Sequence, residues 1–343
     1  PGHGAGAGGG FRRRVPDDGA ALMGGNAAGA LPPELADAVR LVREDREHGA
    51  SWLARMTARA LASASQPGDV AEAAERLARL HTAAAAFVAA RPSMAAVANT
   101  AARAWAAARI PDAPDDSDAA PEVRLRAVYD GATALLSRWD DSTRAMVEAA
   151  HPLLSGTIFT HSRSGTVEAV LRSLADSGAN GERCALVTES RPGGEGVALA
   201  RSLASGGWRV TLIADAASGS FLPQAGVVVL GADSVRDDGS VVNKIGSYLV
   251  ALAARAAGVP VYVLCETLKI AAPGFPLVFE EMDAGELLPE AVAGVTPRNV
   301  YFDRTPAELI SGVISERGLL SREEIRRRAE EAGAALDLLS NGE

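Results

Sequence analysis

One segment, residues 231–246, brings together side chains of the kinds that ligand sites use. Asp233 comes directly after the apolar run Val227–Leu230, and the same segment carries Asn243 and Lys244. The apolar run is typical of a buried parallel strand, and open α/β sheets bind ligands at the carboxyl ends of such strands. An acid and an ammonium group at that edge of the sheet indicate a ligand site. The alternative is that Asp233 caps a helix and Lys244 is solvated, and the local sequence leaves both interpretations open.

Polar side chains also follow other predicted strands, which cover residues 157–160, 185–188, 210–213, 227–230, 261–264 and 300–303. These side chains are His161, Ser162, Arg163 and Ser164 after the first strand, Arg191 after the second and Lys269 after the fifth. Because the carboxyl ends of parallel strands share one edge of a sheet, we expect the side chains to lie near Asp233. Basic side chains and the free N–H groups of a helix start hold phosphate oxyanions. The set therefore favours an anionic, sugar-like ligand over plain helix capping.

His161 has two interpretations. Imidazole titrates near neutrality, so His161 could serve as a general acid in that site. The alternative is a structural histidine whose ring nitrogens bond the backbone.

The alternation of strands and helices after residue 154 predicts the fold class. It indicates a doubly wound, mostly parallel, Rossmann-like α/β sheet. No Gly-x-Gly-x-x-Gly follows the first strand and no phosphate-loop Gly-Lys-Ser/Thr is present, which argues against dinucleotide oxidoreductases and nucleoside triphosphatases. Residues 192–196 are glycine-rich and are interpreted as a tight turn. We expect no cofactor and no metal.

The chain divides into three predicted parts. Residues 1–32 form a flexible Gly/Ala-rich leader, residues 33–154 a helical domain, and residues 155–343 the Rossmann-like ligand-binding domain. Prolines and acids at 110–118 predict a loop within the helical domain.

Composition limits the class of partner. The 343 residues include 43 acidic and 34 basic side chains, a net charge of -9, which disfavours binding to a nucleic-acid backbone. Cys184 and Cys265 lie in apolar runs and are predicted to be buried thiols of a reducing compartment. No run is long enough to span a bilayer and no signal-peptide pattern begins the sequence, so we expect a cytoplasmic protein without membrane contact.

Seven motifs, in order, extend the pattern over residues 45–332. They are His48-Gly49-Ala50, Arg91-Pro92-Ser93, Glu189-Ser190-Arg191-Pro192, Gly231-Ala232-Asp233-Ser234, Cys265-Glu266-Thr267-Leu268-Lys269, Phe302-Asp303-Arg304-Thr305-Pro306 and Ser315-Glu316-Arg317-Gly318. In them the chain resembles the superfamily that joins the α, β and δ regulatory subunits of eukaryotic initiation factor 2B to ribose-1,5-bisphosphate isomerase and 5-methylthioribose-1-phosphate isomerase.

The resemblance implies phosphate-binding roles for His48, Gly49, Ala50 and Arg91 in the helical domain. His48 stands where the family usually has arginine. Without the resemblance, these motifs would be interpreted as a helix turn and a proline at a helix start.

The chain departs from the isomerases at one important position. Family isomerases carry a cysteine after the Thr-His pair, acting with the aspartate of the Gly-Ala-Asp motif, and this chain has Ser162 there. Serine is a weaker acid and nucleophile than a tuned cysteine. The working hypothesis is an aldose-ketose isomerase for a ribose-type sugar 1-phosphate, with Asp233 as the proton-transfer residue and Ser162 or His161 as its partner. The alternative is a non-catalytic regulatory protein that binds a sugar phosphate or a nucleoside monophosphate.

The resemblance also implies a homodimer, because the family packs its sheet domains about a two-fold axis. The apolar residues 309–314 suit such a contact. The same residues are equally consistent with one more buried strand.

Overall fold

The computed structural model describes residues 31–46, 48–68, 72–92, 94–109, 120–176, 183–279 and 281–341. The predicted leader lies outside the described residues except for its last two positions. The whole predicted loop at 110–118 lies outside them as well.

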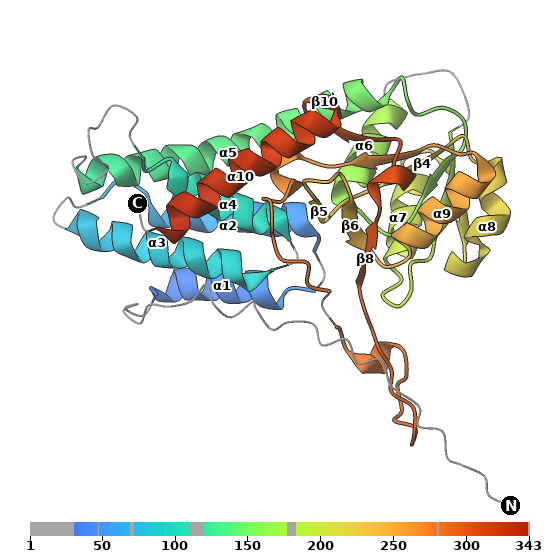
Figure 1. Ribbon diagram of the computed structural model, residues 1–343, viewed down its shortest axis with the longest axis horizontal. Helices are drawn as coiled ribbons and strands as arrows, with labels where there is room; N and C mark the ends of the chain where they lie inside the picture. The colour runs from blue at the N-terminus through green and yellow to red at the C-terminus, as the bar shows by residue number, and fades with distance from the viewer. Residues whose placement is uncertain are drawn as a thin grey trace, which may run out of the picture.

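The N-terminal half is a bundle of helices (Figure 1). Its helices are α1 (Pro33–Glu44), α2 (Ala50–Ala64), α3 (Ala73–Ala90), α4 (Ala95–Ala106) and α5 (Pro121–Ala150). Proline occupies the first turn of α1 and of α5, where its missing N–H costs nothing. Nearly every residue of α4 is buried, and most are alanine, so the neighbouring helices can approach it closely. The helical character predicted for the N-terminal part is confirmed.

The C-terminal half is built on a seven-stranded sheet in the order β10-β9-β7-β4-β1-β2-β3. Its strands are β1 (Ile158–Thr160), β2 (Cys184–Thr188), β3 (Arg209–Ile213), β4 (Val227–Leu230), β7 (Val261–Leu264), β9 (Gly312–Ser315) and β10 (Gly318–Leu320). The helices that accompany it are α6 (Gly165–Asp176), α7 (Glu195–Ser205), the short α8 (Ser218–Phe221) and α9 (Ser247–Ala257). All neighbouring strands are parallel except β10, which pairs antiparallel with β9. The doubly wound, mostly parallel sheet is confirmed.

The strand order fixes where a ligand can bind. The chain moves outward from β1 through β2 to β3, then returns to β4 beside β1 and moves outward the other way through β7. The point between β1 and β4 is therefore the topological switch point, where the connections diverge and leave a crevice beyond the strand ends. The residues after β1 and β4 include Ser162 and Asp233.

A second, antiparallel sheet joins β5 (Ser234–Val235), β6 (Val241–Lys244) and β8 (Phe302–Thr305). The prediction that placed residues 300–303 in the main sheet is wrong, because β8 pairs with β6 instead. Phe302 and Thr305 at the two ends of this strand are buried, whereas Arg304 is exposed. The pairing sets Asn243 opposite Asp303 and holds Lys244 at the edge of the crevice.

The C-terminal segment departs from the prediction in two ways. Residues 312–314 belong to β9, in the interior of the main sheet, so the buried-strand interpretation of 309–314 holds and that run offers no exposed dimer patch. Helix α10 (Arg322–Ser340) buries Ile325 against the sheet core but Leu339 in the helical core. Figure 1 shows α10 running back over the helical bundle. The last helix therefore joins the two halves, and the predicted boundary at 154/155 does not separate it from the first half.

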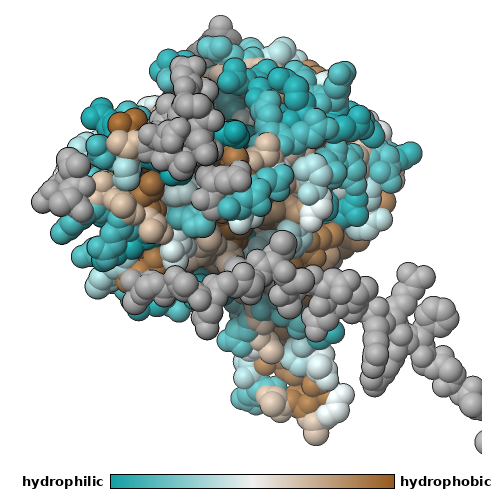
Figure 2. All heavy atoms as spheres, turned by 60° about the vertical axis from the view of Figure 1, so that its left-hand side comes forward, coloured by the Kyte–Doolittle hydropathy of each residue, from teal (hydrophilic) through white to brown (hydrophobic). Residues whose placement is uncertain are grey.

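A long excursion between residues 276 and 299 extends away from the body (Figure 1). Figure 2 shows hydrophobic side chains on this protruding part. The large apolar side chains exposed along it are Leu277, Val278, Phe279, Leu287, Val292 and Val295. Among the helices that the structure describes, none has the length and apolar character needed to cross a membrane.

Candidate functional site

Two adjoining cavities lie over the switch point. The first, here called the helix-start cavity, is lined by Gly49, Ala50, Ser51, Trp52, His161, Ser162, Arg163, Ser164, Gly165, Ala232, Asp233, Asn243 and Lys269. The second, here called the basic cavity, is lined by Arg46, His48, Gly49, Arg91, Met94, Ser162, Arg163, Glu195, Asp233, Lys244, Met282, Tyr301 and Phe302. Of the predicted site residues, Arg191 alone lines neither cavity. Segments from both halves of the chain are thus brought to one crevice.

Asp233 and Ser162 belong to the wall that both cavities share. The backbone N–H of Asp233 donates to the carbonyl of Val242 at 2.9 Å, which fixes Asp233 between the two sheets. Ser162 has φ 65°, in the left-handed region that residues with a side chain rarely adopt. Such strain persists only where the surroundings enforce it, and it is concentrated at functional sites. The two residues therefore face the crevice from the ends of neighbouring strands, as the sequence predicts.

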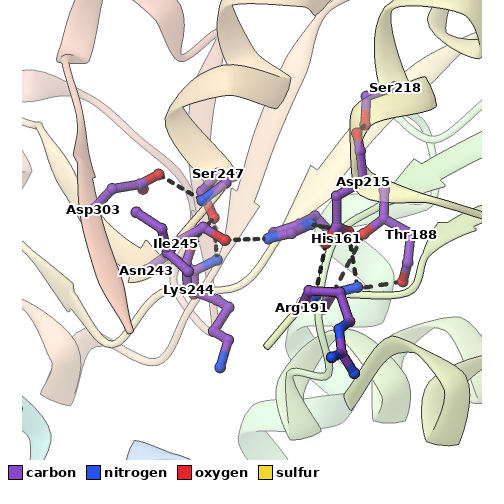
Figure 3. Close-up of polar contacts among 12 residues, drawn as sticks. His161, Thr188, Arg191, Asp215, Ser218, Asn243, Lys244, Ile245, Ser247 and Asp303 are labelled. Carbon is purple, nitrogen blue, oxygen red and sulfur yellow. Dashed lines mark hydrogen bonds and ion pairs between the residues drawn. The ribbon is translucent and has the colours of Figure 1, made fainter. Parts of the chain in front are cut away.

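The ring of His161 is held on both sides by the protein (Figure 3). Its Nε2 lies 2.7 Å from the carbonyl oxygen of Ile245, and its Nδ1 lies 2.7 Å from Oγ1 of Thr188. Since a carbonyl oxygen only accepts, Nε2 carries the proton, and in the neutral ring Nδ1 accepts from Thr188. Gly246, with φ 103°, makes this approach possible, because a Cβ there would lie 2.8 Å from Nε2. This geometry matches the structural interpretation of His161.

Burial lowers the pKa of His161 below its ordinary value of 6.5. Burial has the opposite effect on the pKa of the nearby Asp303, which it raises to about 6. The carboxylate accepts hydrogen bonds from the N–H groups of Gly246 and Tyr248, but these lower the pKa by less than burial raises it. Below pH 6.5 the unfolded chain protonates this histidine more readily than the folded one, so His161 makes stability fall as pH falls. Asp303 makes stability rise as pH falls from about 6 toward 3.8.

We therefore expect the slope of the free energy of unfolding against pH to be less positive in His161→Gln than in the wild type between about pH 6 and 7.5. The reason is that glutamine keeps a donor for Ile245 but has no titrating ring. Urea titrations at several pH values measure this slope. The loss of one titrating group should change the slope by at most about 1.4 kcal/mol per pH unit. Asp303→Asn is the matched control, because it should change the slope in the opposite direction, chiefly below about pH 6. Identical slopes for wild type and His161→Gln would contradict the assignment.

Lys269 sits in a buried ionic cluster at the floor of the helix-start cavity. Its Nζ lies 3.2 Å from Oε2 of Glu266 and donates to Oγ1 of Thr166 at 3.3 Å. Thr166 and Ser51 both donate to the same Glu266 carboxylate, at 3.0 and 3.2 Å. The cluster thus ties the first turns of α2 and α6 to the segment after β7.

Lys269 and Glu266 each stabilise the charged form of the other. Burial alone would lower the pKa of Lys269, but the carboxylates of Glu266 and Asp233 outweigh it and raise that pKa. Burial alone would raise the pKa of Glu266, but Lys269 and the bonds to its carboxylate hold that pKa below its ordinary value. Lys269 is therefore a fixed cation at the cavity, suited to an oxyanion.

Lys244 is held by residues that the sequence did not single out. Its Nζ donates to Oε1 of Glu195 at 2.6 Å and lies 3.5 Å from the ring centroid of Tyr301. Glu195 comes from the glycine-rich stretch that was interpreted only as a turn, and Tyr301 directly precedes β8. Asn243 donates to Oγ of Ser247 and so supports the start of α9. An acidic side chain within a glycine-rich turn after a strand was the sequence signal that could have identified Glu195.

The basic cavity is lined by several basic side chains, most of them from the helical half. Arg91 is buried, and its Nη1 donates to the carbonyl of Asp45 at 2.8 Å. His48 stacks on Trp52 with ring centroids 3.8 Å apart, while its Nδ1 lies 2.8 Å from Oδ2 of Asp45. With Arg46 and Arg163, these side chains make the cavity a favourable place for an anion.

Arg191 contacts its neighbours through its backbone N–H group. Its N–H and that of Ser190 donate to the two carboxylate oxygens of Asp215, at 2.7 and 2.8 Å. The side chain itself is exposed, and Figure 3 shows it extending away from His161. The residue therefore borders the crevice without lining either cavity.

Three comparisons with known proteins show what this chain is similar to. Residues 46–322 match the family described as the initiation factor 2 subunit family. A putative translation initiation factor eIF-2B subunit 2-like protein of Pyrococcus abyssi is 31% identical over 294 residues, covering 84% of this chain and 97% of the relative. The ribose 1,5-bisphosphate isomerase of Haloferax volcanii is 30% identical over 286 residues, which cover 81% of this chain and 85% of the relative. The crystal structure of the Pyrococcus horikoshii translation initiation factor eIF-2B is similar with a TM-score of 0.70 and 30% identity, covering 86% of this chain and 100% of that one.

Proposed function

The chain belongs to the initiation factor 2 subunit family, and on that basis we propose that it is an aldose-ketose isomerase acting on a ribose-type sugar 1-phosphate. The observation that carries the proposal is the shared wall, where Asp233 and Ser162 lie between two cavities that each offer cations. A sugar with a phosphate at each end would span both cavities and place C1 and C2, next to one phosphate, beside Asp233. Ribose 1,5-bisphosphate has this form.

In the proposed mechanism Asp233 transfers the proton of the isomerisation. The bond between C1 and the ring oxygen breaks and that oxygen takes a proton, Asp233 removes the proton from C2 and returns it to C1, and the C2 hydroxyl loses its proton as it becomes a carbonyl. The proton that the hydroxyl loses replaces the one that the ring oxygen takes, so none is gained or lost overall. Ser162 donates a hydrogen bond to the sugar oxygens, and His161 positions the loops around them. Phosphate contacts from basic side chains orient the sugar and help to exclude water, and helix-start N–H groups add to them. The residues that supply these contacts are Lys269, Arg91, Lys244, Arg163, Gly49, Ala50 and Ser164.

The test is direct turnover. Purified protein is incubated with ribose 1,5-bisphosphate, 5-methylthioribose 1-phosphate and 5-deoxyribose 1-phosphate, and the ketose is followed by NMR. We expect the bisphosphate to be converted fastest, because only it can engage both cavities. Binding without conversion of any of the three would overturn the isomerase proposal.

The second candidate is a regulatory protein that binds a sugar phosphate or a nucleoside monophosphate without converting it. The observation that favours it is Ser162, at the position where the family resemblance implies a cysteine for an isomerase. The likeness to an initiation factor subunit is compatible with this role. Binding of all three sugars with no turnover would support it.

Ser162→Cys is expected to raise turnover of the family substrates. A thiol at this backbone position is a stronger proton donor than a hydroxyl, and general acid catalysis contributes about 10² or more to rates. The measurement is kcat for ribose 1,5-bisphosphate. Ser205→Cys is the control, since it adds a thiol at an exposed position that lines neither cavity over the switch point. Lower activity in Ser162→Cys than in the wild type would count against a donor role for this position.

The protein is further proposed to be a homodimer. The apolar side chains exposed on the excursion at 276–299, together with Leu249 and Leu252 of α9, would be covered in such an assembly. Light scattering should give a mass near twice the 35.2 kDa of the chain. A mass near that of a single chain at micromolar concentration would refute the dimer.

A further inference from the structure

A third cavity, here called the four-arginine cavity, lies between the helical bundle and the sheet. It has a volume of about 390 Å³ and shares no wall residue with the two cavities over the switch point. Its walls come from α4, α5, α10, the segment after β7 and the turn between β9 and β10. The size is that of a pocket for a small molecule.

Four arginines from four different elements line this cavity. They are Arg103 of α4, Arg138 of α5, Arg317 of the β9–β10 turn and Arg328 of α10. Arg328 uses Nη1 to bond Glu331 at 2.8 Å. Within the described part of the chain, the side chains of the other three make no hydrogen bond or ion pair. The cavity therefore carries several guanidinium groups whose donors are not used.

Two of the donors at this cavity are buried. The Nη2 group of Arg103 and the Nε1 group of Trp139 are both inaccessible to water and have no acceptor among the described residues. A buried donor without an acceptor costs free energy, and both of these donors belong to residues of the cavity wall. Burial and the positive charges of Arg328 and Arg138 also lower the pKa of Arg103, while Glu331 and Glu316 partly offset this.

The acidic side chains in the cavity wall form no ion pair with Arg103, Arg138 or Arg317 among the described residues. Both carboxylate oxygens of Glu316 accept from Thr267, one from its N–H at 3.0 Å and one from its hydroxyl. The carboxylate of Glu266 is taken by Ser51, Thr166 and Lys269 on the other side of the same segment. Asp141 is the remaining acid and is exposed.

We propose that the four-arginine cavity is a second binding site, for a small polyanion with two or more phosphate or carboxylate groups. Guanidinium groups converging from several sides match such oxyanions in geometry and charge, because each presents a planar fork of donors. A single small anion would satisfy only one or two of the four, whereas a polyanion can bridge them.

The test uses two probes, pyrophosphate for phosphate groups and citrate for carboxylates. Isothermal titration calorimetry at low ionic strength compares the wild type with Arg138→Gln/Arg317→Gln, which removes the two exposed arginines and keeps the half-buried Arg103 and Arg328. The matched control is Arg144→Gln/Arg326→Gln, because these arginines are exposed on α5 and α10, line none of the three cavities and remove the same charge. Thermal unfolding should confirm that both double variants fold.

We expect at least one probe to bind the wild type and the control equally, and Arg138→Gln/Arg317→Gln to bind it about tenfold more weakly or to lose one binding event. This comparison separates the site from the switch-point cavities, whose residues are unchanged in both variants. Preference for pyrophosphate or for citrate identifies the ligand class. The proposal is overturned if neither probe binds at millimolar concentration, or if the two double variants bind alike.

Discussion

Asp233→Asn is expected to abolish turnover of ribose 1,5-bisphosphate while the sugar still binds. Asparagine keeps the shape of the side chain and can still form hydrogen bonds, but it cannot accept and return a proton. Because general acid–base catalysis contributes about 10²–10⁴ to the rate, kcat should fall by that factor. The Kd for the sugar should change little, since the phosphate groups are held by other residues. Single-turnover kinetics and calorimetry measure the two quantities separately.

The matched control for this change is Asp237→Asn. Asp237 lies in the turn that follows β5, and its side chain accepts from the N–H of Asp238 within that turn. Asparagine can still accept there, so neither turnover nor binding should change. Wild-type turnover by Asp233→Asn would show that the proton is carried by another group, and equal losses of turnover in both variants would point to disruption of the loop.

The main sheet and its ligand edge could be predicted because both depend on local patterns. Runs such as Val227–Leu230 are apolar throughout, as strands buried on both faces must be. In a parallel sheet the residue after such a run is carried to the ligand edge regardless of the distant sequence. The position of Asp233 therefore followed from a short apolar run and the acid beyond its end.

The partners of the site residues could not be predicted, because they come from distant parts of the chain. Glu266 accepts from Ser51, which lies 215 positions earlier, and no periodicity relates the two. Lys244 of β6 likewise depends on Glu195 of α7 and on Tyr301, which directly precedes β8. The sequence indicated which residues carry charge, whereas packing decided which of those charges are already paired inside the protein.

The dependence on distant contacts also explains why the strand predicted at 300–303 was placed in the wrong sheet. Its residues have the pattern of one more strand, and they do form one, but strand propensity does not specify a pairing partner. Asp303 is used to bond the start of α9, which requires β8 to lie beside β6. Register and sheet membership thus depended on a contact across 57 residues.

Lys269→Met is expected to lower the free energy of unfolding by about 3–5 kcal/mol, because it leaves Glu266 buried without its cation. Lys269 is 4% exposed and Glu266 7% exposed, so water cannot compensate for the lost charge. Urea denaturation at about pH 7.5 measures the loss. The matched control is Arg126→Met, which breaks an ion pair with Asp130 on the exposed surface of α5 and should cost at most about 0.5 kcal/mol.

The double variant Glu266→Gln/Lys269→Met separates stability from binding. Glutamine can still accept from Ser51 and Thr166 and carries no charge, so most of the lost stability should return. Affinity for a phosphorylated sugar should nevertheless stay low, because the cation of the helix-start cavity is still missing, and a loss of about 1.5–3 kcal/mol is the scale of one charged hydrogen bond. If the double variant regained wild-type affinity, Lys269 would serve only to neutralise Glu266. If instead its stability did not recover, the cost would arise from lost packing of the lysine stem and not from the unpaired carboxylate.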